Sequence, residues 1–196
     1  MKLLRILIIA VLLLFPLSAQ AEEAINAVQV HINKVLDVLR DKSIKEDSAA
    51  SVRKEKIRNI SNDMFDYTEL SRRTMAQNWK KLSDAEQNEF VKLYKQILEN
   101  AYINKLLNYK DEEVVFSKEK KLAENNTEVY TKIITKSVEI PIDYKLVLKN
   151  NGWKVYDISI EGVSLVSNYR NQFKEILINK SSAEFLEILR KKVSAI

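Results

Sequence analysis

Few side chains in this chain have the chemistry of a catalytic or metal-binding group. Its 196 residues include one histidine, His31, and no cysteine. A Ser-His-Asp triad would have to use His31, which borders the apolar stripe of an expected helix with no supporting motif nearby. One histidine without thiolates is also a poor ligand set for zinc. No glycine-rich phosphate or dinucleotide motif occurs. We therefore expect no metal, no cofactor and no catalytic residue.

Asp157 is the strongest candidate among the carboxylates for a catalytic role. It lies on an otherwise apolar expected strand, within "DISIEGVSLV". Paired with Tyr144 or Tyr156, it could serve a small isomerase or dehydratase as an acid–base group. The simpler interpretation is structural, with Asp157 pairing to Arg170 or to a helix terminus.

The first 21 residues, "MKLLRILIIAVLLLFPLSAQA", are typical of a secretory signal peptide. Two basic residues precede an apolar run, and an A-x-A pattern predicts cleavage after Ala21. The alternative is an uncleaved anchor, but the run is short of the about 20 residues that a span needs. The expected mature domain is 22–196, in the periplasm. Its formal net charge of +5 is too diffuse to indicate nucleic-acid binding.

The hydrophobic period predicts four helices, four strands and two further helices. Expected helices cover 23–41, about 49–64, 66–79 and 84 to about 109, and two more follow Gly162 and Ser181. Expected strands cover 113–116, 128–136, 139–149 and 153–160, the last with Tyr156, Ile158 and Ile160 on one side. Short connections favour an antiparallel meander with helices on one face, an α+β fold.

Two longer stretches identify a family. "FDYTELSRRTMAQNWKKLSDAEQNEFVKLYKQIL" (65–98) and "WKVYDISIEGVSLVSNYRNQF" (153–173) closely resemble the MlaC family, also called the toluene-tolerance auxiliary family. The match includes the Phe-Asp pair, the W-K-V-Y-D strand and the final G-V-S-L-V-x-x-Y-R-x-Q-F. Ala76 and Asn179 depart from the pattern, because the family often has glycine at both positions.

The resemblance implies an NTF2-like fold, in which a curved four-stranded antiparallel sheet and a helical subdomain enclose an apolar cavity. It also implies a monomeric, non-enzymatic periplasmic phospholipid carrier that helps to maintain outer-membrane lipid asymmetry. The implied partners are phospholipid, the inner-membrane MCE-domain subunit of an ABC transporter, and an outer-membrane lipoprotein–porin complex. A carrier of hopanoids or other lipids, and a pure adaptor between envelope complexes, remain as alternatives.

A lipid carrier must bury acyl chains. Two chains of about 15 methylenes would cost on the order of 20 kcal/mol in water. Gly162 would let the last strand turn directly into a helix, so that the following residues form a strand–helix seam at the tail wall. Ordinary core packing is the rival explanation. The expected lipid-binding residues are Phe65, Trp79, Phe90, Tyr94, Leu98, Tyr144, Tyr156, Val163, Leu165, Val166, Tyr169 and Phe173.

Overall fold

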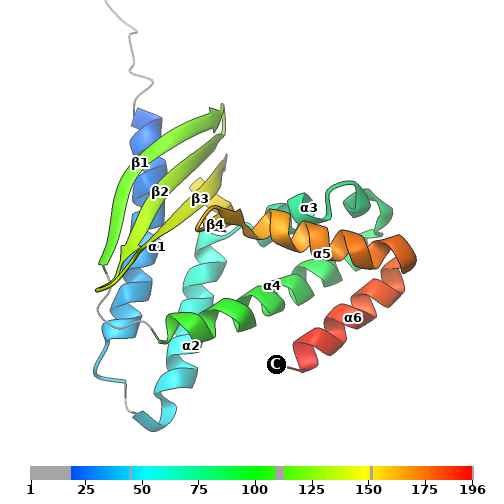
Figure 1. The fold of residues 1–196 in the computed structure, drawn as a ribbon, viewed down its shortest axis with the longest axis horizontal. Coiled ribbons are helices and arrows are strands. Elements are labelled where there is room, and N and C mark those ends of the chain that lie inside the picture. Colours follow the sequence, from blue (N-terminus) through cyan, green and yellow to red (C-terminus); the bar gives the residue numbers. More distant parts are fainter. Residues whose placement is uncertain (1–18, 45, 109–112, 151, 196) are drawn as a thin grey trace, which may run out of the picture.

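The computed structural model describes residues 19–44, 46–108, 113–150 and 152–195. Residues 1–18 of the expected signal peptide therefore lie outside the described residues. The elements follow the chain in this order (Figure 1): α1 (Ala19–Arg40), α2 (Glu46–Met64), α3 (Tyr67–Met75), the 3-10 helix η1 (Ala76–Lys81), α4 (Asp84–Leu106), β1 (Glu113–Ala123), β2 (Asn126–Ile134), β3 (Glu139–Lys149), β4 (Gly152–Ile160), β5 (Val163–Ser164), α5 (Leu165–Asn179) and α6 (Ser182–Ser194).

The α+β class and the antiparallel meander are confirmed, but the sheet has five strands, in the order β1-β2-β3-β4-β5, instead of four. The missed strand, β5, is a two-residue return that pairs Val163 with Ile160. Its turn needs two positive φ angles, 50° at Glu161 and 80° at Gly162, as in the tightest hairpins. A strand this short leaves no periodic pattern to read.

β1 runs to Ala123, seven residues beyond the expected end at 116. The extra length, "SKEKKLA", is mostly exposed on the edge of the sheet and shows no hydrophobic alternation. Two irregularities in its pairing with β2, between Phe116 and Lys118 and between Lys121 and Ala123, disturb the period further. Lysines and bulges are common on edge strands, where they discourage unwanted pairing.

A bulge in β4 changes the face assignment near Tyr156. Lys145 of β3 pairs with Asp157, yet the next residue, Leu146, pairs with Val155, so Tyr156 is the extra residue. Tyr156 therefore does not share the side of Ile158 and Ile160, and that prediction was wrong. Its ring lies under the guanidinium of Arg73 in α3, whose Cζ is 3.8 Å from the ring centroid. Bulges of this kind redirect a side chain without ending the strand.

The helix expected over 66–79 ends at Met75 and continues as η1. The break occurs at Ala76, whose φ of 49° and ψ of −120° leave the helical region. Capping side chains fix the helix starts that the sequence indicated. The Asp66 carboxylate accepts from the Glu69 N–H, and Ser83 with Glu86 forms the capping box of α4. The last helix, α6, starts with the capping box of Ser181 and Glu184.

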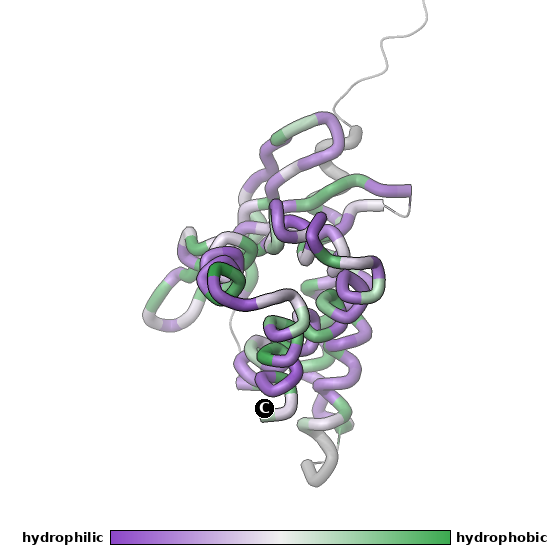
Figure 2. Tube along the Cα trace, turned by 90° about the vertical axis from the view of Figure 1, so that its right-hand side faces the viewer, coloured by the Kyte–Doolittle hydropathy of each residue, from purple (hydrophilic) through white to green (hydrophobic). Residues whose placement is uncertain are grey.

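Two separate hydrophobic clusters hold the fold together. The sheet cluster packs α1, through Ala24 and Val28, against Val129, Tyr144, Leu146 and Val155, with Met64 of α2 completing it. The helical cluster joins α3, η1, α4, α5 and α6 beyond the β4 edge of the sheet (Figure 1). Figure 2 views this helical end and shows hydrophobic and hydrophilic stretches alternating along the helices, as amphipathic packing requires.

Helices meet both faces of the sheet, so the prediction of helices on one face was wrong. α1 covers the face that carries Tyr144 and Leu146. Asp157 and Lys145 lie on the other face, where they meet the start of α5. The sequence could not show this, because a helix that follows a hairpin can return to either face.

Candidate functional site

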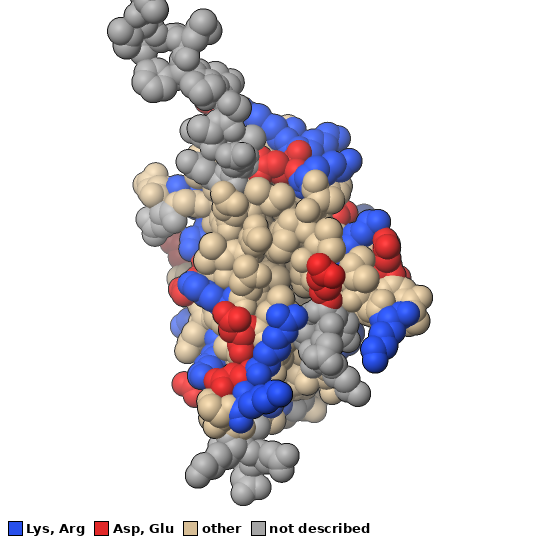
Figure 3. All heavy atoms as spheres, turned by 90° about the vertical axis from the view of Figure 1, so that its left-hand side faces the viewer, with Lys and Arg blue, Asp and Glu red and all other residues tan. Residues whose placement is uncertain are grey.

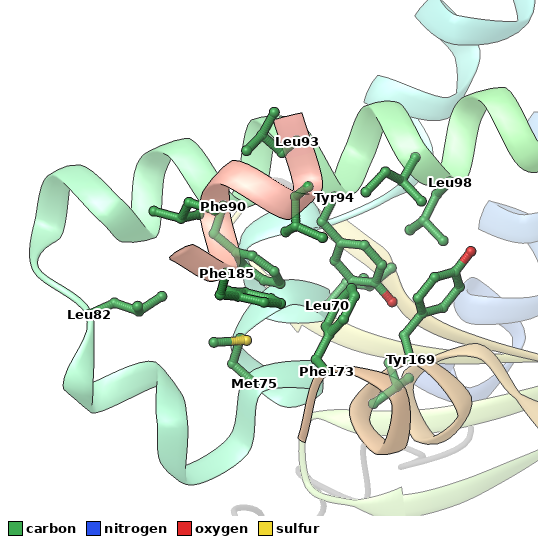
Figure 4. Packing of buried hydrophobic residues seen from close by; sticks show 14 residues of the cluster. Leu70, Met75, Leu82, Phe90, Leu93, Tyr94, Leu98, Tyr169, Phe173 and Phe185 are labelled. Atoms are coloured by element: carbon green, nitrogen blue, oxygen red, sulfur yellow. The ribbon is translucent and has the colours of Figure 1, made fainter. Parts of the chain in front are cut away.

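The helical cluster is built around aromatic rings. Phe90 stacks on Tyr94 with ring centroids 5.5 Å apart, and Phe173 meets Phe90 edge-on at 5.7 Å. Tyr169 approaches Tyr94 at 5.1 Å, and Phe185 of α6 lies 5.3 Å from Phe173. Figure 4 shows these rings converging from α4, α5 and α6 into one layer. Edge-on and offset contacts of this kind are favourable beyond the area that they bury.

Hydroxyl groups interrupt this apolar layer at its α3 side. Thr74 is almost fully buried; its hydroxyl donates to the Leu70 carbonyl at 2.9 Å and lies 3.4 Å from the Tyr94 hydroxyl. Ser71, only 1% exposed, has no hydrogen-bond partner for its hydroxyl among the residues that the structure describes. Burial raises the pKa of Tyr94 and of Tyr169 above the ordinary phenol value. The tyrosines are therefore neutral polar groups inside a mainly apolar cluster.

The strand–helix seam is organised by Asp157. Its Oδ1 accepts the backbone N–H of Val166 at 3.1 Å, and its Oδ2 accepts the Ser164 hydroxyl at 2.7 Å. Ser164 in turn caps α5 by accepting the Ser167 N–H at 3.0 Å. Lys145 lies 3.6 Å from the same carboxylate. The carboxylate thus satisfies one buried N–H donor at the start of α5 and the hydroxyl of its N-cap serine, which is a structural role.

Arg170, the other charged residue that could pair with Asp157, instead caps a helix end. Its Nε and Nη2 donate to the Arg73 carbonyl at 3.1 and 2.7 Å, at the C-terminal end of α3. Asp157 therefore pairs with a helix terminus, as one of the two structural interpretations held, and Arg170 pairs elsewhere. Together these contacts tie α5 to both β4 and α3.

The structure brings half of the expected lipid-binding residues into one place. Six of them belong to the helical cluster: Phe90, Tyr94, Leu98, Val166, Tyr169 and Phe173. Phe65 and Trp79 pack against this cluster. Tyr144 lies in the sheet cluster on the α1 side, and Tyr156 lies under Arg73. Leu165 is 8% exposed, whereas Val163, at the tip of the return, is 58% exposed.

An open cleft of about 640 Å³ lies where the α2–α3 link crosses the β3–β4 hairpin. Phe65 lines it, and this is the one expected residue that does. The cleft residues that sequence reasoning missed are Asp66, Tyr67, Leu148, Lys149 and Lys154. Asp66 stands at the start of the helix expected over 66–79, and the two lysines lie at the facing ends of the strands expected over 139–149 and 153–160, so none of the three indicated a cleft. Residues 65–68 and 148–154 form the cleft, and a local sequence pattern cannot predict a cleft between segments about 80 residues apart.

Among the described residues, no cluster of three or more histidine, aspartate or glutamate side chains is arranged to hold a metal ion. No helix in the described part of the chain combines the length and the apolar character needed to cross a bilayer.

Comparison with known proteins now settles the family. The family model described as MlaC protein matches residues 29–191. The chain belongs to the MlaC family. A curated relative from Haemophilus influenzae, the intermembrane phospholipid transport system binding protein MlaC, is 27% identical over 135 residues. That match covers 65% of this chain and 63% of the relative, so the chain spans less than two thirds of the relative's length.

A solved structure shares the fold of this MlaC family member. It is the phospholipid-binding protein from Ralstonia solanacearum in complex with a phospholipid, which aligns with a TM-score of 0.77 at 20% identity. The alignment covers 88% of this chain and 98% of the other. The α+β architecture with an open antiparallel sheet and six helices is therefore shared with a solved structure.

Proposed function

We propose that this chain is a periplasmic phospholipid carrier of the MlaC type, a binding protein and not an enzyme. The observation that carries the proposal is the match of the family model over 163 positions, from 29 to 191. The H. influenzae relative is named as a phospholipid transport binding protein, and the R. solanacearum structure contains a phospholipid. We infer the same class of ligand here.

The helical cluster supports this proposal as the place for acyl chains. Its rings come from three helices, α4, α5 and α6, so a small outward shift of α5 or α6 would open space lined by apolar surface. Burying a methylene gains about 0.8 kcal/mol, so lipid tails can replace ring–ring contacts at little net cost. The cavity between sheet and helices that the family implies would then form together with its ligand.

The contacts of Asp157 weigh against the enzyme alternative. Both of its oxygens already accept hydrogen bonds at the start of α5. Tyr144 points to the opposite face of the sheet, in the sheet cluster. Tyr156 stacks under Arg73. A catalytic Asp–Tyr pair with an open substrate position is not assembled by these three side chains.

The cellular setting is also part of the proposal. Residues 1–21 would direct export and be removed after Ala21, leaving 22–196 as a monomeric carrier in the periplasm. Its partners would be an inner-membrane MCE-domain subunit of an ABC transporter and an outer-membrane lipoprotein–porin complex. On the face over α1 and β1, Lys and Arg side chains lie beside Asp and Glu side chains, with uncharged residues between these groups (Figure 3).

Lipid uptake tests the proposal. Delipidated protein is incubated with vesicles of phosphatidylethanolamine and phosphatidylglycerol, separated from them, and extracted for phosphorus analysis. We expect about one or two phospholipids per chain. Uptake of hopanoid but not of phospholipid from mixed vesicles would move the assignment to another lipid class. A stable, folded protein that takes up neither lipid would support a pure adaptor and overturn the carrier proposal.

A further inference from the structure

Glu99 is a buried carboxylate on α4, the helix that crosses α2 (Figure 1). The residue is 8% exposed and follows Ile97 and Leu98, which belong to the helical cluster. Its Oε1 has no hydrogen-bond partner among the residues that the structure describes. A carboxylate that has lost water without gaining a hydrogen bond is costly in its ionised form.

Two cations face this carboxylate, and neither approaches it closely. Arg58 Nε, on α2, lies 3.5 Å from Glu99 Oε2, and Lys95 Nζ, one turn earlier on α4, lies 3.8 Å from Oε1. A charge-assisted hydrogen bond is shorter, at about 2.7–2.9 Å. The side chains of Arg58 and Lys95 are also 43% and 30% exposed, so water screens their charges. The two ion pairs therefore offset only part of the cost of burying an ionised Glu99.

Tyr67 is the titratable neighbour that α3 contributes. Its hydroxyl donates to Ser61 Oγ of α2 at 3.0 Å, and Lys95 Nζ lies 5.4 Å from its ring centroid. Burial raises the pKa of Tyr67 to about 12, and the charge of Glu99 contributes to the same shift. Tyr67 is therefore neutral at physiological pH, and its proton is already donated to Ser61. It does not compensate the charge of Glu99.

The balance of these contacts makes Glu99 sensitive to pH. Burial raises the pKa of Glu99 above the ordinary glutamate value, and the charges of Lys95 and Arg58 lower it by less. Because the pKa of the folded protein is the higher one, protonated Glu99 favours the closed packing of α2 on α4. That contribution is complete below the ordinary pKa of about 4.3 and is lost as pH rises through the pKa of the folded protein.

The junction of α2 and α4 connects the two hydrophobic clusters. Met64, at the end of α2, belongs to the sheet cluster, whereas Leu98 of α4 belongs to the helical cluster. A separation of α2 from α4 would admit water to Glu99 and return its pKa toward the ordinary value. Opening of the junction and ionisation of Glu99 are therefore linked, and each promotes the other.

We propose that Glu99 is a pH-sensitive clasp between α2 and α4, which loosens on ionisation and speeds exchange of lipid, and which tightens on protonation and slows it. The inference rests on the proposed function, because lipid exchange is the process that the clasp would control. Linkage fixes the size of the effect. The opening equilibrium of the ionised protein exceeds that of the protonated protein tenfold for each pKa unit between the closed and the open junction.

Distances between α2 and α4 test the clasp without any lipid. Because the chain lacks cysteine, Asn59→Cys with Gln96→Cys, both at exposed positions, allows one pair of nitroxide labels across the junction. In lipid-free protein, double electron–electron resonance should give one narrow distance distribution at about pH 4.5 and a growing share of longer distances toward about pH 8. The same labels on Glu99→Gln should give the narrow distribution throughout. Arg58→Ala should move the midpoint to higher pH, because it removes a cation that favours the ionised form.

Release of lipid tests the consequence for exchange. Protein loaded with phosphatidylethanolamine is mixed with phosphatidylcholine vesicles over the same pH range. Release from the unchanged protein should quicken severalfold, with its midpoint at the Glu99 pKa that a carbon-13 NMR titration measures. Glu99→Gln should release lipid at one slow rate. Glu89→Gln is the matched control on α4, since Glu89 pairs with Arg190 at 2.6 Å and its pKa is lowered by that contact. This control should keep the pH dependence of the unchanged protein.

The outcomes separate the clasp from the carrier function. Distances that do not change with pH would overturn the clasp, and so would a pH dependence of release that survives in Glu99→Gln. Distances that respond to pH while release stays constant would overturn the control of exchange. In each of these cases lipid is still loaded and the carrier function stands. Failure of the folded, unchanged protein to load phospholipid would instead remove the carrier function, and with it the control of exchange.

Discussion

Replacing Asp157 with alanine should destabilise the domain by at least about 3 kcal/mol, because the change leaves the buried Val166 N–H at the start of α5 without its acceptor. The carboxylate side chain is 5% exposed and accepts from the Val166 N–H and the Ser164 hydroxyl. An unsatisfied buried N–H costs about 1–3 kcal/mol, and a lost hydroxyl bond about 1 kcal/mol. The lost charge at a helix N-terminus adds about 0.3–1 kcal/mol. The 3.6 Å contact with Lys145 adds about 0.5 kcal/mol.

Urea unfolding, followed by circular dichroism at 222 nm and by tryptophan fluorescence, measures this loss. For a domain of this size, 3 kcal/mol corresponds to a fall in Tm of about 6–12 °C. Asp157→Asn keeps an acceptor for the Val166 N–H and should lose about 1 kcal/mol.

Asp143→Ala is the matched control, on the neighbouring strand and the same face. Burial and the nearby Glu128 raise the pKa of Asp143, so its charge is not favoured there, and its removal should change stability by less than about 0.5 kcal/mol. Equal stability of Asp157→Ala and Asp143→Ala would refute the capping role and would return Asp157 to the list of candidate catalytic groups.

Three other predictions test separate parts of the structure. Leu165→Glu places a charge at a buried position and should destabilise the domain by more than about 3 kcal/mol in urea unfolding. Val163→Glu, at an exposed position, should leave urea unfolding unchanged. A folded Leu165→Glu protein that loses only lipid would identify Leu165 as a cavity wall. Ala76→Gly should raise Tm by about 2–4 °C, because glycine adopts the φ of 49° and ψ of −120° without strain; a lower Tm would show that Ala76 contributes contacts. The pKa of Glu184 is lowered to about 2, first by the backbone N–H of Ser181, so an NMR titration should place it well below the ordinary value near 4.3. Its stabilising effect should then be complete above about pH 5 and disappear as pH falls toward 2, and Glu184→Gln should abolish that dependence.

Periodicity and capping signals predicted most elements because each depends on neighbouring residues. The helices expected from residue 84 and after Ser181 are α4 and α6, and capping boxes at Ser83 and Ser181 fix their starts. The bulge at Tyr156 was not predictable, since it depends on how β4 registers with β3. The return strand at Val163 was too short to leave a pattern. Local signals therefore located the elements, and pairing between strands decided which way their side chains point.

In the candidate site too, local patterns were predictive and contacts between distant segments were not. The motif around Gly162 correctly pointed to a strand–helix seam. Three of its residues, Val166, Tyr169 and Phe173, meet three upstream residues of α4 in the helical cluster. The cleft was missed because Phe65 and Lys149 are far apart in sequence and meet only through the bridge between the α2–α3 link and β4. Charged residues at turns and caps are usually solvated, so their types alone gave no reason to connect them.

Native mass spectrometry of the protein purified from the periplasm of a bacterial host tests the carrier proposal most directly. We expect a folded chain that begins after Ala21 and carries a bound mass, which fragmentation identifies as intact glycerophospholipid in roughly stoichiometric amount. A folded chain found only in its free mass, under conditions that preserve a known phospholipid carrier with its lipid, would contradict the account.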